Sequence, residues 1–141
     1  MFKLGRKMIL STLLILALLL PTHALAAKPI TVDPCYTYIY RISTGIVVEG
    51  NNVICEGSAC TKTSSTTTTV KVTLQRRPVG NSTWVYVTSW TDTASGLLAA
   101  WVSESYPITS GNQYRLYTTA TIKNSSGTTV EHAYIYSHIV P

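Results

Sequence analysis

The chain has 141 residues and a net charge of +5, from 11 Lys and Arg residues against 6 Asp and Glu residues. Three of the basic residues, Lys3, Arg6 and Lys7, lie at the N-terminus, so the rest of the chain carries eight basic and six acidic residues, or +2. A charge this close to neutral argues against nucleic acid and anionic membranes as partners, because both require a dense basic patch.

The first 27 residues have the three parts of an export signal peptide. The basic start is followed by an apolar run over residues 8–20, and Ala24–Ala26 supplies the small side chains that signal peptidase accepts. The apolar run is shorter than the roughly 18 residues of a membrane span, so an uncleaved anchor is the less favoured alternative. We expect cleavage after Ala26 or Ala27 and a secreted product with no stable membrane insertion.

The remainder, residues 28–141, is predicted to be a single all-β domain. It is rich in Thr, Val, Tyr and Ile, turn residues recur between short alternating runs, and no segment has a helical period. Such spacing is typical of a sandwich or a small barrel, and we predict an antiparallel β-sandwich of about seven strands. The expected strands are Tyr36–Ile42, Gly45–Cys55 with a break at Gly50–Asn52, Thr66–Arg76, Thr83–Trp90, Leu97–Tyr106, Gln113–Asn124 and Thr129–Val140.

Three cysteines, Cys35, Cys55 and Cys60, fall in the exported part, where an oxidising environment permits a disulfide. We predict a Cys55–Cys60 bridge, because the residues between them include the Gly and Ser of a tight loop. A Cys35–Cys55 bridge between neighbouring strands is the competing pairing. An unpaired Cys35 would be either an inert thiol or the link of a covalent dimer. Three cysteines do not close a zinc site, which needs four ligands, and no metal or other cofactor is predicted.

The run Thr66–Gln75 alternates apolar and polar residues, which directs one set of side chains toward the core. The inward set is Val70, Val72 and Leu74. If Pro78–Asn81 is a four-residue turn, Leu74 lies opposite Val85 on the next strand, and Trp84 and Tyr86 lie on the outer face. An odd-length turn would bury these two aromatic residues instead.

The last two strands can be placed in register, because Ser125–Thr128 has the even length of a hairpin loop and its Gly supplies positive φ. Residues whose numbers sum to 253 should then pair. The predicted core face carries Ile122–Glu131, Ala120–Ala133, Thr118–Ile135, Leu116–Ser137 and Tyr114–Ile139. The predicted solvent face carries Thr121–His132, Thr119–Tyr134, Tyr117–Tyr136 and Arg115–His138.

The segment Gly111–Ala120, in which a Gly-led turn precedes a Tyr and alternating apolar residues, resembles the penultimate strand of fibronectin type III and related immunoglobulin-like sandwiches. The resemblance implies that Tyr114 is a corner tyrosine whose hydroxyl bonds to nearby backbone. The domain also resembles small exported β-sandwich proteins of Gram-positive bacteria, which form uncharacterised families. It departs from antibody domains, because its cysteines cluster early instead of bridging the two sheets.

An enzyme requires acids, bases or nucleophiles that converge, and the sequence indicates no such set. His132 and His138 lie on one predicted strand about 20 Å apart, at roughly 3.3 Å per residue, which is too far for one metal ion. Glu104 and Glu131 would form a glycosidase pair only if the fold brought them together. There is no phosphate-binding glycine loop and no Gly-x-Ser-x-Gly elbow, so we predict that the protein is not an enzyme.

The predicted solvent face is rich in aromatic residues and is the predicted ligand-binding site. Flat rings on a rigid sheet stack against sugar rings or hold extended polypeptide. The alternative is that cross-strand tyrosines only stabilise the sheet. The predicted site consists of Tyr117, Tyr134, Tyr136, Arg115, His132, His138, Trp84 and Tyr86.

These patterns favour a secreted, non-catalytic binding or cell-envelope interaction module. The expected partner is a cell-wall glycan or another extracellular protein. Two alternatives remain open at this point: a structural, self-associating extracellular protein, with Cys35 as a possible dimer link, and a small secreted hydrolase, toxin or inhibitor.

Overall fold

The computed structural model describes residues 28–32 and 36–141, which form eight β-strands and no helix, so the all-β prediction is confirmed. The predicted signal peptide and Cys35 lie outside the described residues. No helix long and apolar enough to cross a membrane occurs in the described part of the chain. The strands are β1 (Ile30–Val32), β2 (Ile39–Glu49), β3 (Asn52–Thr61), β4 (Thr66–Pro78), β5 (Val85–Ser95), β6 (Ala100–Pro107), β7 (Asn112–Asn124) and β8 (Thr129–Tyr136).

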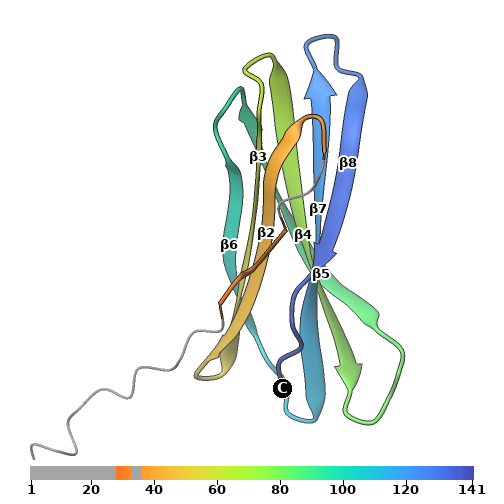
Figure 1. Cartoon of the computed structure of the whole chain (residues 1–141). Coiled ribbons are helices and arrows are strands. Elements are labelled where there is room, and N and C mark those ends of the chain that lie inside the picture. Colours follow the sequence, from red (N-terminus) through yellow and green to blue (C-terminus); the bar gives the residue numbers. More distant parts are fainter. Residues whose placement is uncertain (1–27, 33–35) are drawn as a thin grey trace, which may run out of the picture.

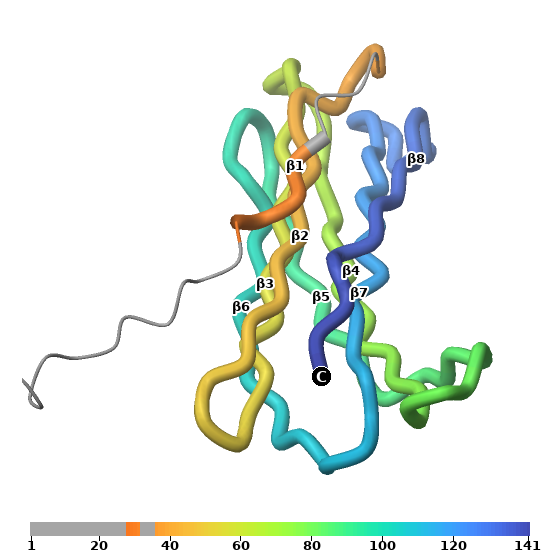
Figure 2. Tube along the Cα trace, turned by 60° about the horizontal axis from the view of Figure 1, so that its bottom comes forward, coloured from red at the N-terminus to blue at the C-terminus, as the bar shows by residue number. Residues whose placement is uncertain are grey.

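The strands form two antiparallel sheets of four strands each, in two layers (Figure 1). Sheet A has the strand order β1-β2-β3-β6, and sheet B has the order β5-β4-β7-β8. The hairpins β2–β3, β4–β5 and β7–β8 stay within a sheet, whereas the connections after β3, β5 and β6 cross to the other sheet. The short β1, which was not predicted, runs along β2 (Figure 2). The predicted antiparallel sandwich is therefore confirmed, with one strand more than expected.

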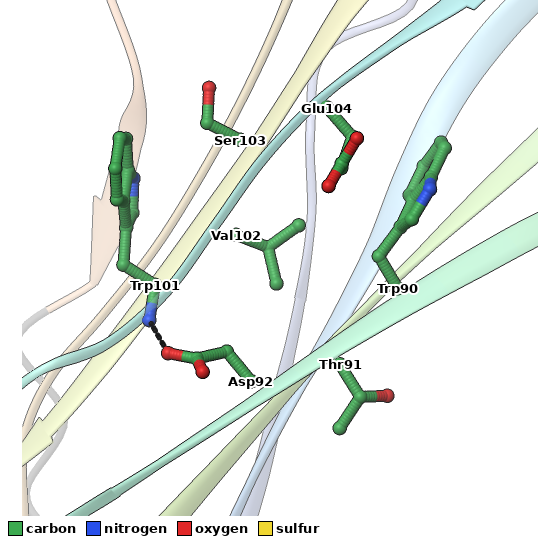
Figure 3. Close-up of a pocket in the computed structure, with 7 residues that line it drawn as sticks. All are labelled: Trp90, Thr91, Asp92, Trp101, Val102, Ser103 and Glu104. Carbon is green, nitrogen blue, oxygen red and sulfur yellow. Dashed lines mark hydrogen bonds between the residues drawn. The ribbon is translucent and has the colours of Figure 1, made fainter.

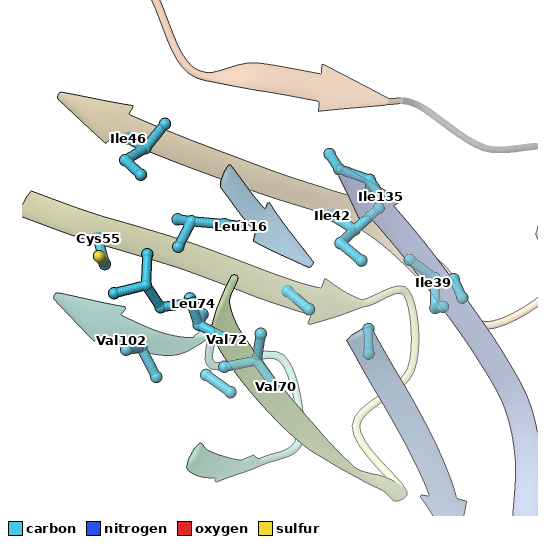
Figure 4. Packing of buried hydrophobic residues seen from close by; sticks show 14 of the residues in the cluster. Ile39, Ile42, Ile46, Cys55, Val70, Val72, Leu74, Val102, Leu116 and Ile135 are labelled. Carbon is cyan, nitrogen blue, oxygen red and sulfur yellow. The ribbon is translucent and has the colours of Figure 1, made fainter. Parts of the chain in front are cut away.

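Alternating apolar side chains of both sheets fill the space between the layers (Figure 4). The alternation predicted for β4 is confirmed, since Val70, Val72 and Leu74 are fully buried. A polar link also crosses this core: Thr118 Oγ1 on β7 donates a hydrogen bond of 2.9 Å to Thr44 Oγ1 on β2. The buried apolar cluster consists of Ile39, Ile42, Ile46, Val53, Cys55, Ala59, Val70, Val72, Leu74, Ala100, Val102, Tyr114, Leu116, Ala120, Ile122, Ala133, Ile135 and Val140.

The predicted register of β7 and β8 is confirmed over the length of β8 that pairs regularly, from Ile122–Glu131 to Tyr117–Tyr136. The turn between them uses Gly127 at a φ of 81°, as the loop chemistry requires. The predicted register is wrong beyond Ser137, because Tyr114 forms its backbone hydrogen bonds with Val140 and not with Ile139. Val140 is consequently buried and Ile139 exposed.

The shift follows from a hydrogen bond of Ser137. Its backbone N donates to Leu116 O, but its hydroxyl accepts from Leu116 N at 2.8 Å, in place of a backbone carbonyl. Between this point and the Tyr114–Val140 pair, β7 has one residue, Arg115, and the C-terminal segment has two. An extra residue on one strand is a β-bulge, which reverses the facing of the residues after it.

Tyr114 is buried at the start of β7, and its hydroxyl accepts a hydrogen bond of 2.9 Å from the backbone N of Thr109. This is the backbone bond that was expected of a corner tyrosine. This hydrogen bond holds the segment before β7, at Thr109, against the first residues of β7.

The predicted boundaries in the first half of the domain are wrong. The segments 36–42 and 45–55 were expected to be separate strands, with a loop between Cys55 and Cys60. In the structure β2 continues through Gly45 and β3 runs without interruption through Gly57. The break expected at Gly50–Asn52 is confirmed, since β2 ends at Glu49 and Gly50 makes the turn with a φ of 60°. Gly57 is buried, and a Cβ added there would overlap Cγ2 of Val72 on the facing sheet. This glycine therefore provides space between the sheets and not a turn.

The predicted pairing of β4 with β5 is also wrong. Leu74 lies opposite Thr88 and not Val85, because β4 extends to Pro78 and the ladder contains a bulge after Leu74. Tyr86 nevertheless pairs with the outward Gln75 and is exposed, as expected. Trp84 precedes β5 and is half-buried.

Candidate functional site

The outer face of sheet B is polar, aromatic and basic. Its outward positions follow from the ladder partners of the buried residues, since alternate residues point to opposite sides. None of these outward strand positions on β4, β5, β7 or β8 holds an Asp or a Glu, whereas Lys71, Arg77, Arg115 and Lys123 all lie there. The face therefore carries positive charge without a compensating carboxylate.

Three tyrosines form a cluster on this face. The ring centroids of Tyr117 on β7 and Tyr136 on β8 are 5.0 Å apart, those of Tyr117 and Tyr134 are 5.7 Å apart, and those of Tyr134 and Tyr136 are 6.1 Å apart. The first two pairs are tilted and the third is edge-on. Tyr117 is half-buried beneath its neighbours, while Tyr134 is 60% exposed and Tyr136 is 42% exposed. The cluster thus presents two rings to solvent on a third that supports them.

Arg115 extends this cluster toward β5. Its guanidinium lies 4.3 Å from the ring centroid of Tyr136 and 4.3 Å from that of Trp84, so it is stacked between two aromatic rings. The guanidinium of Arg77 lies 4.5 Å from the centroid of the same Trp84 ring. We call the connected set Trp84, Arg77, Arg115, Tyr117, Tyr134 and Tyr136 the aromatic–arginine face.

Two reciprocal hydrogen bonds hold the arginines in place. Arg115 Nε on β7 donates to Gln75 Oε1 on β4 at 2.8 Å, and Arg77 Nε on β4 donates to Gln113 Oε1 on β7 at 3.0 Å. Each arginine therefore lies directly opposite its glutamine on the neighbouring strand. Within the described part of the chain, the terminal nitrogens of both guanidinium groups donate to no protein acceptor, so they are available to an anion.

The pKa of Arg115 is lowered, chiefly because burial removes water from its charge and also because Arg77 is close, while the nearby Tyr136 acts in the opposite direction. Arginine remains charged at neutral pH even so. Partial desolvation and a neighbouring like charge are conditions that an incoming anion would relieve.

The structure brings together five of the eight predicted site residues: Trp84, Arg115, Tyr117, Tyr134 and Tyr136. Tyr86 lies on the same face in the row of Gln75 and Arg115, but its hydroxyl contacts Ser89 at 3.4 Å, on its own strand. His132 is on the same face farther along β8, with Nδ1 3.1 Å from Thr121 Oγ1. His138 lies past the end of β8 and is not paired with Arg115, contrary to the prediction.

Arg77 was not predicted as a site residue, because the strand was expected to end at Arg76, whereas β4 extends to Pro78. The signal was present, since Arg77 is two residues from Gln75 and so on the same face of any strand that continues. The bulge after Leu74 and the position of Trp84 before β5 bring the indole over Arg77, and neither could be read from local composition.

The two carboxylates considered as a glycosidase pair are not brought together. Glu104 is on β6 and Glu131 on β8, which are edge strands at opposite sides of the sandwich. The carboxylate of Glu131 instead accepts hydrogen bonds from the backbone N of Thr37, Tyr38 and Ile39 at 2.9, 2.9 and 2.7 Å. Among the described residues, no group of three or more His, Cys, Asp or Glu side chains could hold a metal ion.

The predicted Cys55–Cys60 disulfide is wrong. Both thiols are free, and both residues are in the one strand β3, where no loop brings them together. An odd separation of five places their side chains on opposite faces, and the strand spaces their Cα atoms by roughly 16 Å at about 3.3 Å per residue. A disulfide requires Cα atoms within about 7 Å. The competing Cys35–Cys55 pairing involves a residue outside the described part.

Ionisation of the buried Cys55 thiol should make the folded protein less stable at alkaline pH. Burial, followed by the charge of Glu104, raises its pKa from 9.0 to about 12. Because the folded pKa lies above the unfolded one, this contribution is complete below pH 9 and is lost as the pH rises toward 12. We expect the free energy of unfolding to fall over this window by up to about 1.4 kcal/mol per pH unit. Urea unfolding across the window should show a smaller loss in Cys55→Ala than in Cys60→Ala; equal losses would contradict the assignment.

The sequence matches no model of a known protein family, and no curated protein matches it.

Proposed function

We propose that this protein is a secreted, non-catalytic binding module whose aromatic–arginine face holds an extended, negatively charged glycan of the cell envelope. The observation that carries the proposal is the unbroken series of neighbouring aromatic rings and one guanidinium group on the outer face of sheet B. It runs from Trp84 through Arg115, Tyr136 and Tyr117 to Tyr134.

The exposed aromatic rings are an argument for a polysaccharide ligand. Exposed tyrosine rings present flat apolar surfaces with a hydroxyl at the edge, which suits the faces and hydroxyls of sugars. The rings lie on two neighbouring strands that are hydrogen-bonded along their length, so little conformational freedom is lost on binding. A row of this kind favours an extended ligand over a compact one.

The arginines are an argument for negative charge on the proposed polysaccharide. The terminal nitrogens of Arg115 and Arg77 donate to no acceptor among the residues that the structure describes, and guanidinium groups pair with carboxylates and phosphates through two parallel hydrogen bonds. Lys71 and Lys123 add positive charge on the same face, and no outward strand position supplies a competing acid. A neutral glycan would leave these positive side chains without a counter-charge from the ligand.

We further propose that the sandwich is of the immunoglobulin or fibronectin type III kind and that it folds after export. Support comes from the seven strands β2 to β8 in two antiparallel sheets and from the hydroxyl of Tyr114, which bonds to backbone a few residues upstream. The signal-peptide pattern of residues 1–27 supports export.

Co-sedimentation of the purified protein with insoluble cell-wall material tests the proposed function. The variant Tyr134→Ala/Tyr136→Ala should bind roughly tenfold more weakly, because each aromatic contact contributes about 0.5–1.5 kcal/mol. Tyr40→Ala is the matched control, since Tyr40 is 54% exposed on sheet A. Binding should also weaken as salt is raised, and on wall material stripped of phosphate polymers or with its carboxylates amidated. Wild-type binding by the double variant would mean that these tyrosines serve only the sheet.

A further inference from the structure

A concave surface lies at the edge of the sandwich, between β5 of sheet B and β6 of sheet A (Figure 3). It is an open cleft of about 500 Å³. Trp90 and Trp101 stand on its two sides, Val102 lies between them, and Asp92 and Glu104 enter it from the two strands. The volume is within the range of small-ligand sites in proteins.

Both carboxylates occupy positions that elsewhere in the sandwich hold core residues. Asp92 lies opposite the buried Val70 in the β4–β5 ladder, and Glu104 lies opposite the buried Cys55 in the β3–β6 ladder. Residues directly opposite one another share a face of the sheet, so both acids project from the inner faces of the two layers. This edge is consequently lined by the two carboxylates as well as by the apolar Trp90 and Val102.

The two carboxylates lack a basic partner. Asp92 Oδ2 accepts a hydrogen bond of 2.8 Å from the backbone N of Trp101, and no described residue donates a hydrogen bond to Glu104. Among residues 28–32 and 36–141, no Lys, Arg or His side chain forms an ion pair with either acid. The charge of Glu104 reaches the interior, since it contributes to the raised pKa of Cys55. The cleft is therefore a negative site on a chain whose net charge is positive.

We propose that this cleft binds an alkylammonium group, specifically the lysine side chain of a partner polypeptide. The two carboxylates neutralise an ammonium in the cleft, and the indole of Trp90, on the same inner face as Asp92, adds cation–π attraction. Trp101, which lies opposite Ser58 on the outer face of sheet A, lines the rim of the cleft. The aliphatic stem of a lysine would lie against the rings and Val102. The site is distinct from the aromatic–arginine face in place and opposite to it in charge, and it does not depend on the glycan proposal.

Inward-pointing acids on edge strands also have a purely structural use, because they discourage another strand from adding to the sheet. That use requires the charges but not the aromatic walls. Trp101 is 58% exposed, although burying an indole is strongly favourable. An exposed indole beside an open cleft with unpaired carboxylates is accounted for by a ligand and not by edge protection alone.

Proton–nitrogen correlation spectra of the purified protein test the proposal, because the three tryptophans give three indole signals. Titration with Nα-acetyl-lysine methylamide should shift the Trp90 and Trp101 signals saturably and leave Trp84, on the aromatic–arginine face, unchanged. The probe for charge is Nα-acetyl-norleucine methylamide, which has a similar stem and no ammonium. It should produce no saturable shift.

The variant Glu104→Gln should bind the lysine probe at least about tenfold more weakly, because a charge-assisted contact is lost. Asp92→Asn, whose amide oxygen can still accept from Trp101, should show a similar loss. Glu49→Gln, an exposed acid at the end of β2, is the matched control and should bind as the wild type does. The proposal is overturned if the lysine probe gives no saturable shift, if the norleucine probe binds equally well, if Glu104→Gln and Glu49→Gln bind alike, or if a neutral methyl glycoside alone shifts Trp90 and Trp101.

Discussion

Replacing Gly57 with alanine is expected to lower the free energy of unfolding by about 1–3 kcal/mol, the usual cost of overpacking a core. Gly57 is in the interior of β3, where its missing side chain lets the two sheets approach. An added Cβ would overlap Cγ2 of Val72 and lie 3.1 Å from Cγ2 of Thr118. Both neighbours belong to central strands of sheet B, so neither can withdraw without moving the core. Urea unfolding measures the loss.

Gly45→Ala is the matched control for this substitution. Gly45 is also buried in a strand of sheet A, but a Cβ there would meet Pro29 at 3.5 Å, an ordinary contact. It should be neutral or slightly stabilising, because alanine restricts the unfolded chain. Adding Val72→Ala to Gly57→Ala removes the overlapping methyl, so the double variant should be more stable than the sum of the single effects predicts. Equal stability of the two alanine variants would show that the sheets can part without cost.

Replacing Glu131 with alanine is expected to lower the free energy of unfolding by about 3 kcal/mol, because hydrogen bonds to a charged group contribute roughly 1.5–3 kcal/mol each and part of this is recovered by solvent. The carboxylate on β8 accepts from three successive backbone N–H groups that lead into β2. It thereby fastens sheet A to sheet B at the side opposite the β5–β6 edge. The sequence predicted only that Glu131 lies on the core face opposite Ile122, and the structure shows that its carboxylate connects the two layers.

Hydrogen exchange gives the sharper measurement for this residue. In Glu131→Ala the amides of Thr37, Tyr38 and Ile39 should lose protection, while amides in the centre of β4 and β7 should change only with global stability. Glu131→Gln should fall between wild type and alanine, since one amide oxygen remains as an acceptor. Glu49→Ala, the exposed control, should have little effect. Unchanged protection of residues 37–39 in Glu131→Ala would show that the carboxylate does not hold this segment.

The parts of the fold that could be predicted are those where local chemistry decides the outcome. The β7–β8 register follows from loop length and from Gly127 at positive φ, and the inward face of β4 follows from strict alternation. Gly57 shows the limit, because a glycine required for space and a glycine required for a turn look the same in a sequence. Treating it as a turn divided β3 and produced the wrong disulfide between Cys55 and Cys60.

The candidate site was predicted in part for the same reason. Tyr117, Tyr134 and Tyr136 were placed together because one hairpin carries all three. Trp84 was placed on the correct side, although the register used to place it was wrong, and Arg77 was missed because its strand is longer than expected. The cleft at Trp90 and Trp101 could not be foreseen at all, since it depends on which strands become the edges of different sheets.

The hydroxyl pair at the centre of the core, Thr118 with Thr44, has a consequence for how the two layers are aligned. Aliphatic contacts are tolerant of sliding, because their attraction depends on area and hardly on direction. A hydrogen bond has a direction and a short range. With Thr118 donating to Thr44 at 2.9 Å, displacement of one layer by a single residue would leave the buried Thr118 hydroxyl without this acceptor in an apolar interior, whereas Thr44 Oγ1 would keep its bond to Glu56 O in its own sheet. The pair therefore selects one offset between the layers, and so fixes the relative positions of the outer face and the edge cleft.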